Sequence, residues 1–166
     1  TVVLTSNKAF STGIKAAGGS VSNDANHISG PSRTGEELYL AIGKALQAAG
    51  IVAGDVGFIS AHGTATIFND EMEAKAIGLA GMQEIPVNSL KGYYGHTLGA
   101  AGLIESIISF QSLKEELLIP TRGFENSGVS QVVNVCSSLQ KTTAQHFLKT
   151  ASGFGGCNAA MVFSKQ

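Results

Sequence analysis

The sequence predicts an α/β fold in which helices cover a mixed β-sheet. Helix and strand patterns alternate up to residue 117, short strand patterns dominate after residue 130, and many of the 21 glycines cluster at the expected turns. With 166 residues, 43% of them hydrophobic, the chain is long enough to bury the core of one domain. We expect a layered α/β domain that is closed by at least two antiparallel strands.

Two weak strand patterns and a loop come first. Residues 1–4 are apolar and β-branched, and residues 13–22 favour a second strand that Gly18 and Gly19 interrupt. Residues 24–33 combine Asn, His, Ser, Gly and Pro, a composition typical of a loop.

A clear helix pattern covers residues 34–49. Thr34 can cap its N-terminus, Glu37 completes a capping box three residues later, and Gly50 ends the helix. Apolar residues recur at helical spacing along one face: Leu38, Ala41, Ile42, Ala45, Leu46 and Ala49.

Two further helices are expected. Asn69 or Asp70 can cap a helix that continues to Leu79. The longest helix pattern covers residues 97–117 and ends before Pro120. Its first turns carry small residues on every side, which predicts a helix that is buried all round.

The remaining patterns predict strands. Residues 56–61 predict a buried strand that ends at His62, and residues 85–90 predict a strand that ends at Lys91. Three late strands are expected over residues 132–135, 147–151 and 159–163.

Composition limits the class of protein. Eleven basic and twelve acidic residues give a net charge of -1, so no charge pattern indicates a nucleic acid or an anionic membrane as partner. No apolar run approaches the ~20 residues of a membrane-spanning helix, and no signal peptide is visible, although the sequence begins at Thr1. The two cysteines suit the thiols of an intracellular protein, and we expect a cytoplasmic one.

Two histidines stand where predicted strands run into predicted helices. His62 lies in Ala61-His62-Gly63-Thr64-Ala65-Thr66, and His96 follows Lys91-Gly92-Tyr93-Tyr94-Gly95. Catalytic groups of α/β enzymes gather at the carboxyl ends of strands. Two imidazoles there can donate hydrogen bonds to one developing oxyanion, which indicates acyl chemistry.

The neighbours of these histidines support a site. The hydroxyls of Thr64 and Thr66 can orient the ring of His62, and the start of the next helix favours a neutral imidazole. A buried Lys91 would need a carboxylate. Glu73 is the candidate partner, and Asp70 and Glu105 are the other acids near these turns.

A glycine-rich turn, Gly153-Phe154-Gly155-Gly156, separates the last two predicted strands. It can be a tight hairpin and nothing more. It can also present backbone N–H groups of Gly153 to Gly155 to an oxyanion, with Phe154 as a movable apolar wall.

Three segments in order resemble the β-ketoacyl-acyl carrier protein synthases, condensing enzymes of the thiolase fold. The segments are His62-Gly63-Thr64-Ala65-Thr66 with Asn69-Asp70, Lys91 to Gly102, and Gly153-Phe154-Gly155-Gly156-Cys157-Asn158. The resemblance implies one half of a thiolase-like fold, with a mixed five-stranded sheet. It implies that residues 1–31 hold the last strands of the N-terminal half and a linker, and that residues 32–166 are the C-terminal half.

The resemblance also implies a chemistry. In this family two histidines bind the malonyl thioester carbonyl while carbon dioxide leaves, and the enolate attacks an acyl group held on a cysteine. By resemblance His62 and His96 take these roles, Lys91 with an acid such as Glu73 orders the site, and Phe154 gates the pocket. Acyl groups would arrive on the phosphopantetheine of an acyl carrier protein, with no other cofactor and no metal. The whole enzyme would be a homodimer.

The nucleophile is not expected in this chain. Cys136 ends an apolar strand-like run and lacks the helix start that lowers a thiol pKa, and Cys157 is expected to pack. The family cysteine belongs upstream, so the isolated chain is expected to be inactive. Ala151 and Ser152 also stand where the family usually has a serine and an aromatic residue, which leaves the acyl-chain preference open.

Two alternatives remain. A non-catalytic partner of the chain-length-factor type often loses active-site histidines, whereas both are present here. A glutamine in place of the upstream cysteine would favour that partner. A thiolase-like enzyme acting on coenzyme A thioesters is the other alternative, and the segment from Lys91 to Gly102 argues against it.

Overall fold

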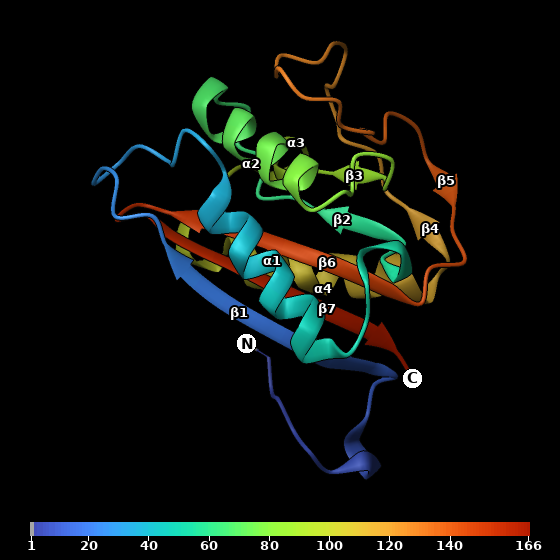
Figure 1. Cartoon of the computed structure of the whole chain (residues 1–166). Helices are drawn as coiled ribbons and strands as arrows, with labels where there is room; N and C mark the ends of the chain where they lie inside the picture. Colours follow the sequence, from blue (N-terminus) through green and yellow to red (C-terminus); the bar gives the residue numbers. More distant parts are fainter. Residues whose placement is uncertain (1) are drawn as a thin grey trace.

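A five-stranded mixed sheet forms the centre of the molecule. The computed structural model describes residues 2–166, and the sheet order is β1-β7-β6-β2-β3 (Figure 1). Its strands are β1 (Ile14–Asn23), β2 (Phe58–Ser60), β3 (Val87–Asn88), β6 (His146–Gly153) and β7 (Cys157–Lys165). β7 is antiparallel to both β1 and β6, while β2 is parallel to both β6 and β3. The mixed sheet with antiparallel closing strands is thus confirmed.

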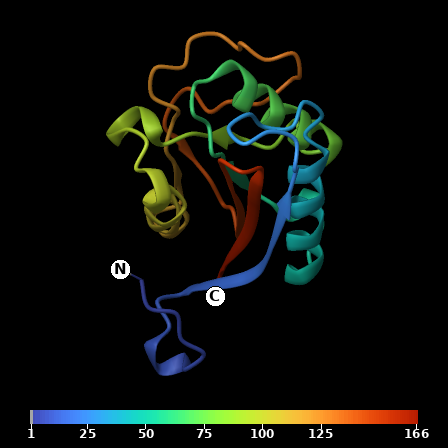
Figure 2. The same cartoon turned by 90° about the vertical axis from the view of Figure 1, so that its left-hand side faces the viewer.

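Helices cover both faces of this sheet. α1 (Glu36–Ala49) and α2 (Ile67–Leu79) pack on one face, and α4 (Ala101–Lys114) packs on the other (Figure 2). The short elements are η1 (Lys8–Phe10), η2 (Ala53–Asp55), α3 (Lys91–Tyr94), η3 (Leu98–Ala100) and the strand pair β4 (Leu117–Leu118) and β5 (Gln140–Lys141). No helix within residues 2–166 is long and apolar enough to cross a bilayer.

The two faces of the sheet bury two separate hydrophobic clusters. Phe58 and Phe147 stack with ring centroids 5.0 Å apart on the α4 side. Their neighbours Ile59 and Leu148 point to the opposite face, into the cluster with α1 and α2. Because side chains alternate along a strand, each residue of β2 and β6 is assigned to one helix layer.

The predicted N-cap residues are wrong for α1 and α2. α1 begins at Glu36 after Gly35, which has a φ of 77°. A Cβ on Gly35 would lie 2.6 Å from the carbonyl oxygen of Met72, so the close approach of α2 requires glycine there and displaces Thr34 from the cap. Gly50 does end α1, as predicted, with a φ of 72°.

Helix α2 begins at Ile67, two residues before the earlier of the predicted caps. Asp70 therefore lies inside the first turn, where its Oδ1 accepts a hydrogen bond from the backbone amide of Thr64 at 3.2 Å. An acidic side chain in the first turn can still accept hydrogen bonds from backbone amides that lack a partner at the helix start and in the turn before it.

Three other expectations, two strands and a helix buried all round, are not met because these segments lack a packing or pairing partner. Thr1 lies outside the described residues, and residues 2–4 form no strand; Val3 and Leu4 are exposed. Residues 132–135 contribute a single bridge, from Val135 to Val87. α4 is not buried all round, because Leu103 and Ile107 are exposed.

Candidate active site

His62 follows β2 directly, and a carboxylate fixes its backbone. The amide of His62 donates to Glu73 Oε1 at 2.9 Å, and the amide of Gly63 donates to Glu73 Oε2 at 2.6 Å. The hydroxyl of Thr150, on β6, donates to the same Glu73 Oε1 at 2.8 Å. Glu73 is buried, so these bonds replace the water that a carboxylate would otherwise need.

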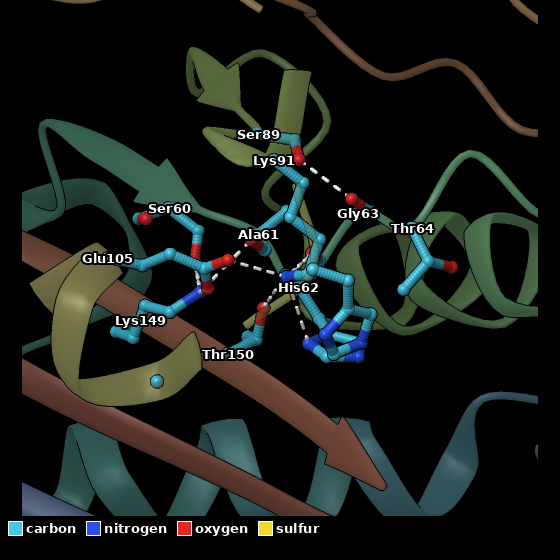
Figure 3. A network of polar contacts seen from close by, with 12 residues as sticks. Ser60, Ala61, His62, Gly63, Thr64, Ser89, Lys91, Glu105, Lys149 and Thr150 are labelled. Atoms are coloured by element: carbon cyan, nitrogen blue, oxygen red, sulfur yellow. Dashed lines mark hydrogen bonds and ion pairs between the residues drawn. The ribbon is translucent and has the colours of Figure 1, made fainter. Parts of the chain in front are cut away.

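Lys91 begins α3 just after β3 and reaches across to His62 (Figure 3). Its Nζ donates to the backbone carbonyl of His62 and lies 3.3 Å from the ring Nδ1. Its ion pair is with Glu105 Oε1, at 2.5 Å. The expected pairing with Glu73 is therefore wrong, because Glu73 lies on α2 behind the opposite face of the sheet and already binds two amides.

His96 lies next to His62, as the strand-to-helix positions predicted. The two rings meet edge to face, with centroids 5.2 Å apart and planes at 80°. His62 is buried and His96 is exposed. The site thus has one ring fixed inside the protein and one at its surface.

Hydrogen bonds fix the same tautomer in both rings. His96 Nδ1 accepts from the backbone amide of Leu98 at 3.0 Å, and His62 Nδ1 faces the ammonium of Lys91. Both contacts are with groups that only donate, so in the neutral rings the hydrogen must lie on Nε2. Each histidine therefore offers one N–H donor to a ligand.

Burial and the charge of Lys91 lower the pKa of His62 to about 3. Lys149 and His96 lower it further, and Glu105 opposes them. The ring is neutral at physiological pH, as expected, but the main cause is burial rather than the start of the following helix.

Two residues that contact the site were not expected from the sequence, Lys149 and Thr150. They are neighbours on β6 and point to opposite faces, Lys149 to Glu105 on α4 and Thr150 to Glu73 on α2. The available signal was a lysine and a threonine inside an otherwise apolar run, Phe147 to Ala151. A buried lysine in such a run requires a partner.

The hydroxyls of Thr64 and Thr66 lie 2.8 Å apart and bond to each other. They do not hold the ring of His62; Lys91 and Glu73 hold that residue instead. The serine hydroxyl of Ser89 donates to the carbonyl of Gly63 at 2.7 Å and closes the turn from the side of β3.

The turn after β6 lies at the edge of the sheet where β2 also ends, because β6 runs parallel to β2. Phe154 at its tip is 83% exposed. The amide of Gly155 donates to the carbonyl of Ile28 at 2.7 Å, so this N–H is already used. Within residues 2–166 no hydrogen bond joins the segment Gly153–Gly156 to either histidine, and the gate and oxyanion roles stay predictions.

A cavity of about 650 Å³ opens beside the histidines, between α2 and the loop over residues 121–135. Its wall includes Gly63, Thr64, Lys91 and His96. Among the described residues, no three side chains of His, Cys, Asp or Glu lie close enough together to bind a metal ion.

Neither cysteine lies in this wall. Cys136 is buried among Phe58, Leu113 and other apolar side chains, and its Sγ donates to the carbonyl of Ser138. Burial raises the pKa of the Cys136 thiol, which makes it a poor nucleophile. Cys157 is exposed, so the expectation that its side chain packs is wrong.

Comparison with known proteins gives a consistent result. The family model described as "Beta-ketoacyl synthase, C-terminal domain" matches residues 14–125. The 3-oxoacyl-[acyl-carrier-protein] synthase 2 of Vibrio cholerae is 34% identical over 159 residues, which are 91% of this chain and 38% of that protein. The protein of the same name from Rhizobium meliloti is 35% identical over 149 residues, covering 87% and 35%. The chain thus spans less than two fifths of these curated relatives.

Solved structures agree. A ketosynthase in complex with its chain length factor, from Xenorhabdus doucetiae, matches with a TM-score of 0.87 and 31% identity over 94% of this chain and 40% of the other. A type II PKS acyl-carrier protein in complex with its ketosynthase matches with a TM-score of 0.85 and 29% identity over 92% and 38%. The expected fold class, one half of a thiolase-like fold, is confirmed by these neighbours.

Proposed function

Because this chain belongs to the family of β-ketoacyl synthase C-terminal domains, we propose that it supplies the decarboxylation side of a 3-oxoacyl-acyl carrier protein synthase active site. The reaction would be the decarboxylative Claisen condensation of a malonyl thioester with an acyl thioester, in fatty acid or polyketide synthesis. The relatives that carry the synthase name are acyltransferases, which supports this class.

The observation that carries the proposal is the pair of N–H groups on His62 and His96. When the bond to the malonyl carboxylate breaks, its electron pair moves toward the thioester carbonyl and carbon dioxide leaves. The resulting enolate oxygen would accept both Nε2–H bonds, which strengthen as its negative charge develops. The enolate carbon would then attack the acyl thioester and displace its thiolate.

The neutral ring of His62 suits this role. A neutral imidazole donates a hydrogen bond without giving up its proton, so the enolate is stabilised and remains nucleophilic. The low pKa of His62, about 3, keeps this ring neutral over the whole physiological range. Lys91 would act through His62, because it contacts its carbonyl and its Nδ1.

We further propose that the acyl-carrying nucleophile lies outside these 166 residues, so that the chain alone does not condense. The unsuitable setting of Cys136 supports this. An acyl carrier protein as donor is supported by the complex of such a carrier with its ketosynthase among the structural neighbours. A homodimer and a cytoplasmic location stay predictions, as does the boundary between residues 31 and 32.

The test is carbon dioxide release from malonyl-acyl carrier protein, measured on the complete protein and separately from acyl transfer. Replacing His62 or His96 by Ala should lower decarboxylation about 100-fold or more, since each removes one oxyanion donor. His27→Ala, in the exposed loop over residues 24–33, is the matched control and should keep the rate. Full decarboxylation in both site variants would refute the assigned roles.

Covalent acylation of the complete protein separates the chain-length-factor alternative, which the Xenorhabdus complex keeps relevant. A synthase becomes covalently acylated by an acyl-carrier thioester, whereas a partner subunit with glutamine at the nucleophile position does not. Acylation of Cys136 with turnover by the 166 residues alone would contradict the missing nucleophile.

A further inference from the structure

A second lysine, Lys149 on β6, lies deeper in the site than Lys91, which begins α3. The Nζ of Lys149 is 2.6 Å from Glu105 Oε2, 3.0 Å from the carbonyl of Ser60 and 3.0 Å from the carbonyl of Ala61 (Figure 3). Glu105 is fully buried and pairs with Lys91 through its other oxygen. We call Glu105, Lys91 and Lys149 the Glu105 cluster.

We propose that Lys149 is a positioning residue for His62, which holds the end of β2 and adds the positive charge that keeps the His62 ring neutral. The two carbonyls that it binds are the last two before His62 in the chain. Lys149 does not touch the ring, so it acts through space by its charge and through the strand end that it holds.

The surroundings of Lys149 match an ammonium ion. The Nζ donates to two carbonyls and forms an ion pair with one carboxylate oxygen, a contact that requires the charged form. A neutral amine would point its lone pair at one of these oxygens. Burial lowers the pKa of Lys149, and the charge of Glu105 opposes this.

The charge of the cluster follows from its members. Two ammonium groups and one carboxylate leave a net charge of one positive unit beside His62. The other charged or titratable groups around this residue are Glu73 from α2, which binds the backbone amide, and His96 at the ring edge. Removing Lys149 would leave a neutral Lys91–Glu105 pair, and protonation of His62 would become easier.

The test is an NMR titration of the four histidines between pH 2.5 and 8.5. In the unchanged protein the His62 ring should stay neutral down to about pH 4 and take up a proton only near pH 3. In Lys149→Met, which keeps the aliphatic stem and removes the charge, the His62 midpoint should rise by about one pH unit or more. Lys165→Met is the matched control, because Lys165 forms a surface pair with Glu116 and should leave His62 unchanged.

A double variant separates charge from packing. Lys149→Met with Glu105→Gln leaves Lys91 alone, so the cluster again carries one positive unit and the His62 midpoint should fall back. A midpoint that does not move in Lys149→Met, or that stays raised in the double variant, would overturn the proposal. The signals of His27 and His146 show whether each variant is folded.

A measurement on the unchanged protein covers the case in which Lys149→Met does not fold. The ¹⁵N shift of Lys149 Nζ at pH 7 should be that of an ammonium group with slowly exchanging hydrogens, and a neutral amine would overturn the proposal. The role of Lys149 in keeping His62 neutral does not depend on the proposed function. Only the purpose of the neutral ring, to donate to an enolate, rests on that proposal. Neither NMR experiment depends on turnover, so the failure of one proposal is distinguishable from that of the other.

Discussion

The ring of His62 meets the edge of His96 at a centroid distance of 5.2 Å, although the two residues follow different strands. β2 and β3 are parallel neighbours, so the segments that leave their carboxyl ends start side by side. The rigid sheet therefore sets the position of the buried ring, and the short helix α3 sets the position of the exposed one.

The low pKa of His62 predicts a loss of stability on acidification. The unfolded chain takes up a proton at this histidine near its ordinary pKa of 6.5, whereas the folded protein does so only near 3. The free energy of unfolding should therefore fall as the pH decreases from about 6.5 to 3, by about 2 kcal/mol between pH 6.5 and 5. Urea unfolding at a series of pH values measures this.

His62→Asn should reduce this pH dependence, and His27→Asn should preserve it, since His27 is exposed. An equal slope in the unchanged protein and in His62→Asn would show that other groups cause the acid sensitivity.

Glu105 predicts a large effect of losing one buried carboxylate. Glu105→Ala leaves Lys91 and Lys149 buried without a counter-charge, which should cost about 3–5 kcal/mol of unfolding free energy. Glu116→Ala breaks an exposed Glu–Lys pair and should cost no more than about 1 kcal/mol. Chemical denaturation of the two variants measures both losses of unfolding free energy. Similar losses would contradict the stabilising role of Glu105 in the Glu105 cluster.

Gly156, in the turn after β6, is expected not to tolerate substitution. It has a φ of 75°, and an added Cβ would lie 2.2 Å from Asp24 Oδ1. Gly156→Ala should therefore destabilise the protein by about 2 kcal/mol or more, from the strained backbone and the displaced Asp24. Gly99→Ala meets no atom within 4 Å and should be neutral or slightly stabilising in thermal unfolding. Equal melting temperatures would refute this account of the turn.

Phe147 and Phe154 predict opposite outcomes for the same substitution. Phe147 is fully buried and stacks on Phe58, so Phe147→Ala should cost about 3–5 kcal/mol. Phe154 is 83% exposed, and Phe154→Ala should change the stability by less than about 0.5 kcal/mol. Equilibrium unfolding checks both, and a large loss for Phe154→Ala would show that this side chain packs in solution.

The sequence predicted the parts of this molecule that depend on local patterns. The apolar spacing of α1, the strands β6 and β7, and the two strand-to-helix histidines could all be inferred from neighbouring residues. The partner of Lys91 could not, since the sequence favoured Glu73 and only the sheet, which places Glu73 and Glu105 on opposite faces, selects Glu105.

Tertiary contacts explain the other differences. Gly35 replaces Thr34 as the cap because α2 passes close to it, and β2 is only three residues long because its ladder ends where His62 turns toward Glu73. Apart from its apolar neighbours, nothing in the local sequence indicates that Lys149 belongs to the site. Only the pairing of Ser60 with Lys149 brings it there.

The position of β6 has a consequence for biosynthesis. β6 lies between β7 and β2 in the sheet, but His146 comes 86 residues after Ser60 along the chain. A ribosome releases both histidines well before Lys149 and Thr150, the two residues that tie β2 to its flanking glutamates. Such distant pairing forms slowly and late. The nascent chain therefore carries both imidazoles for some time before the strand that aligns them is made.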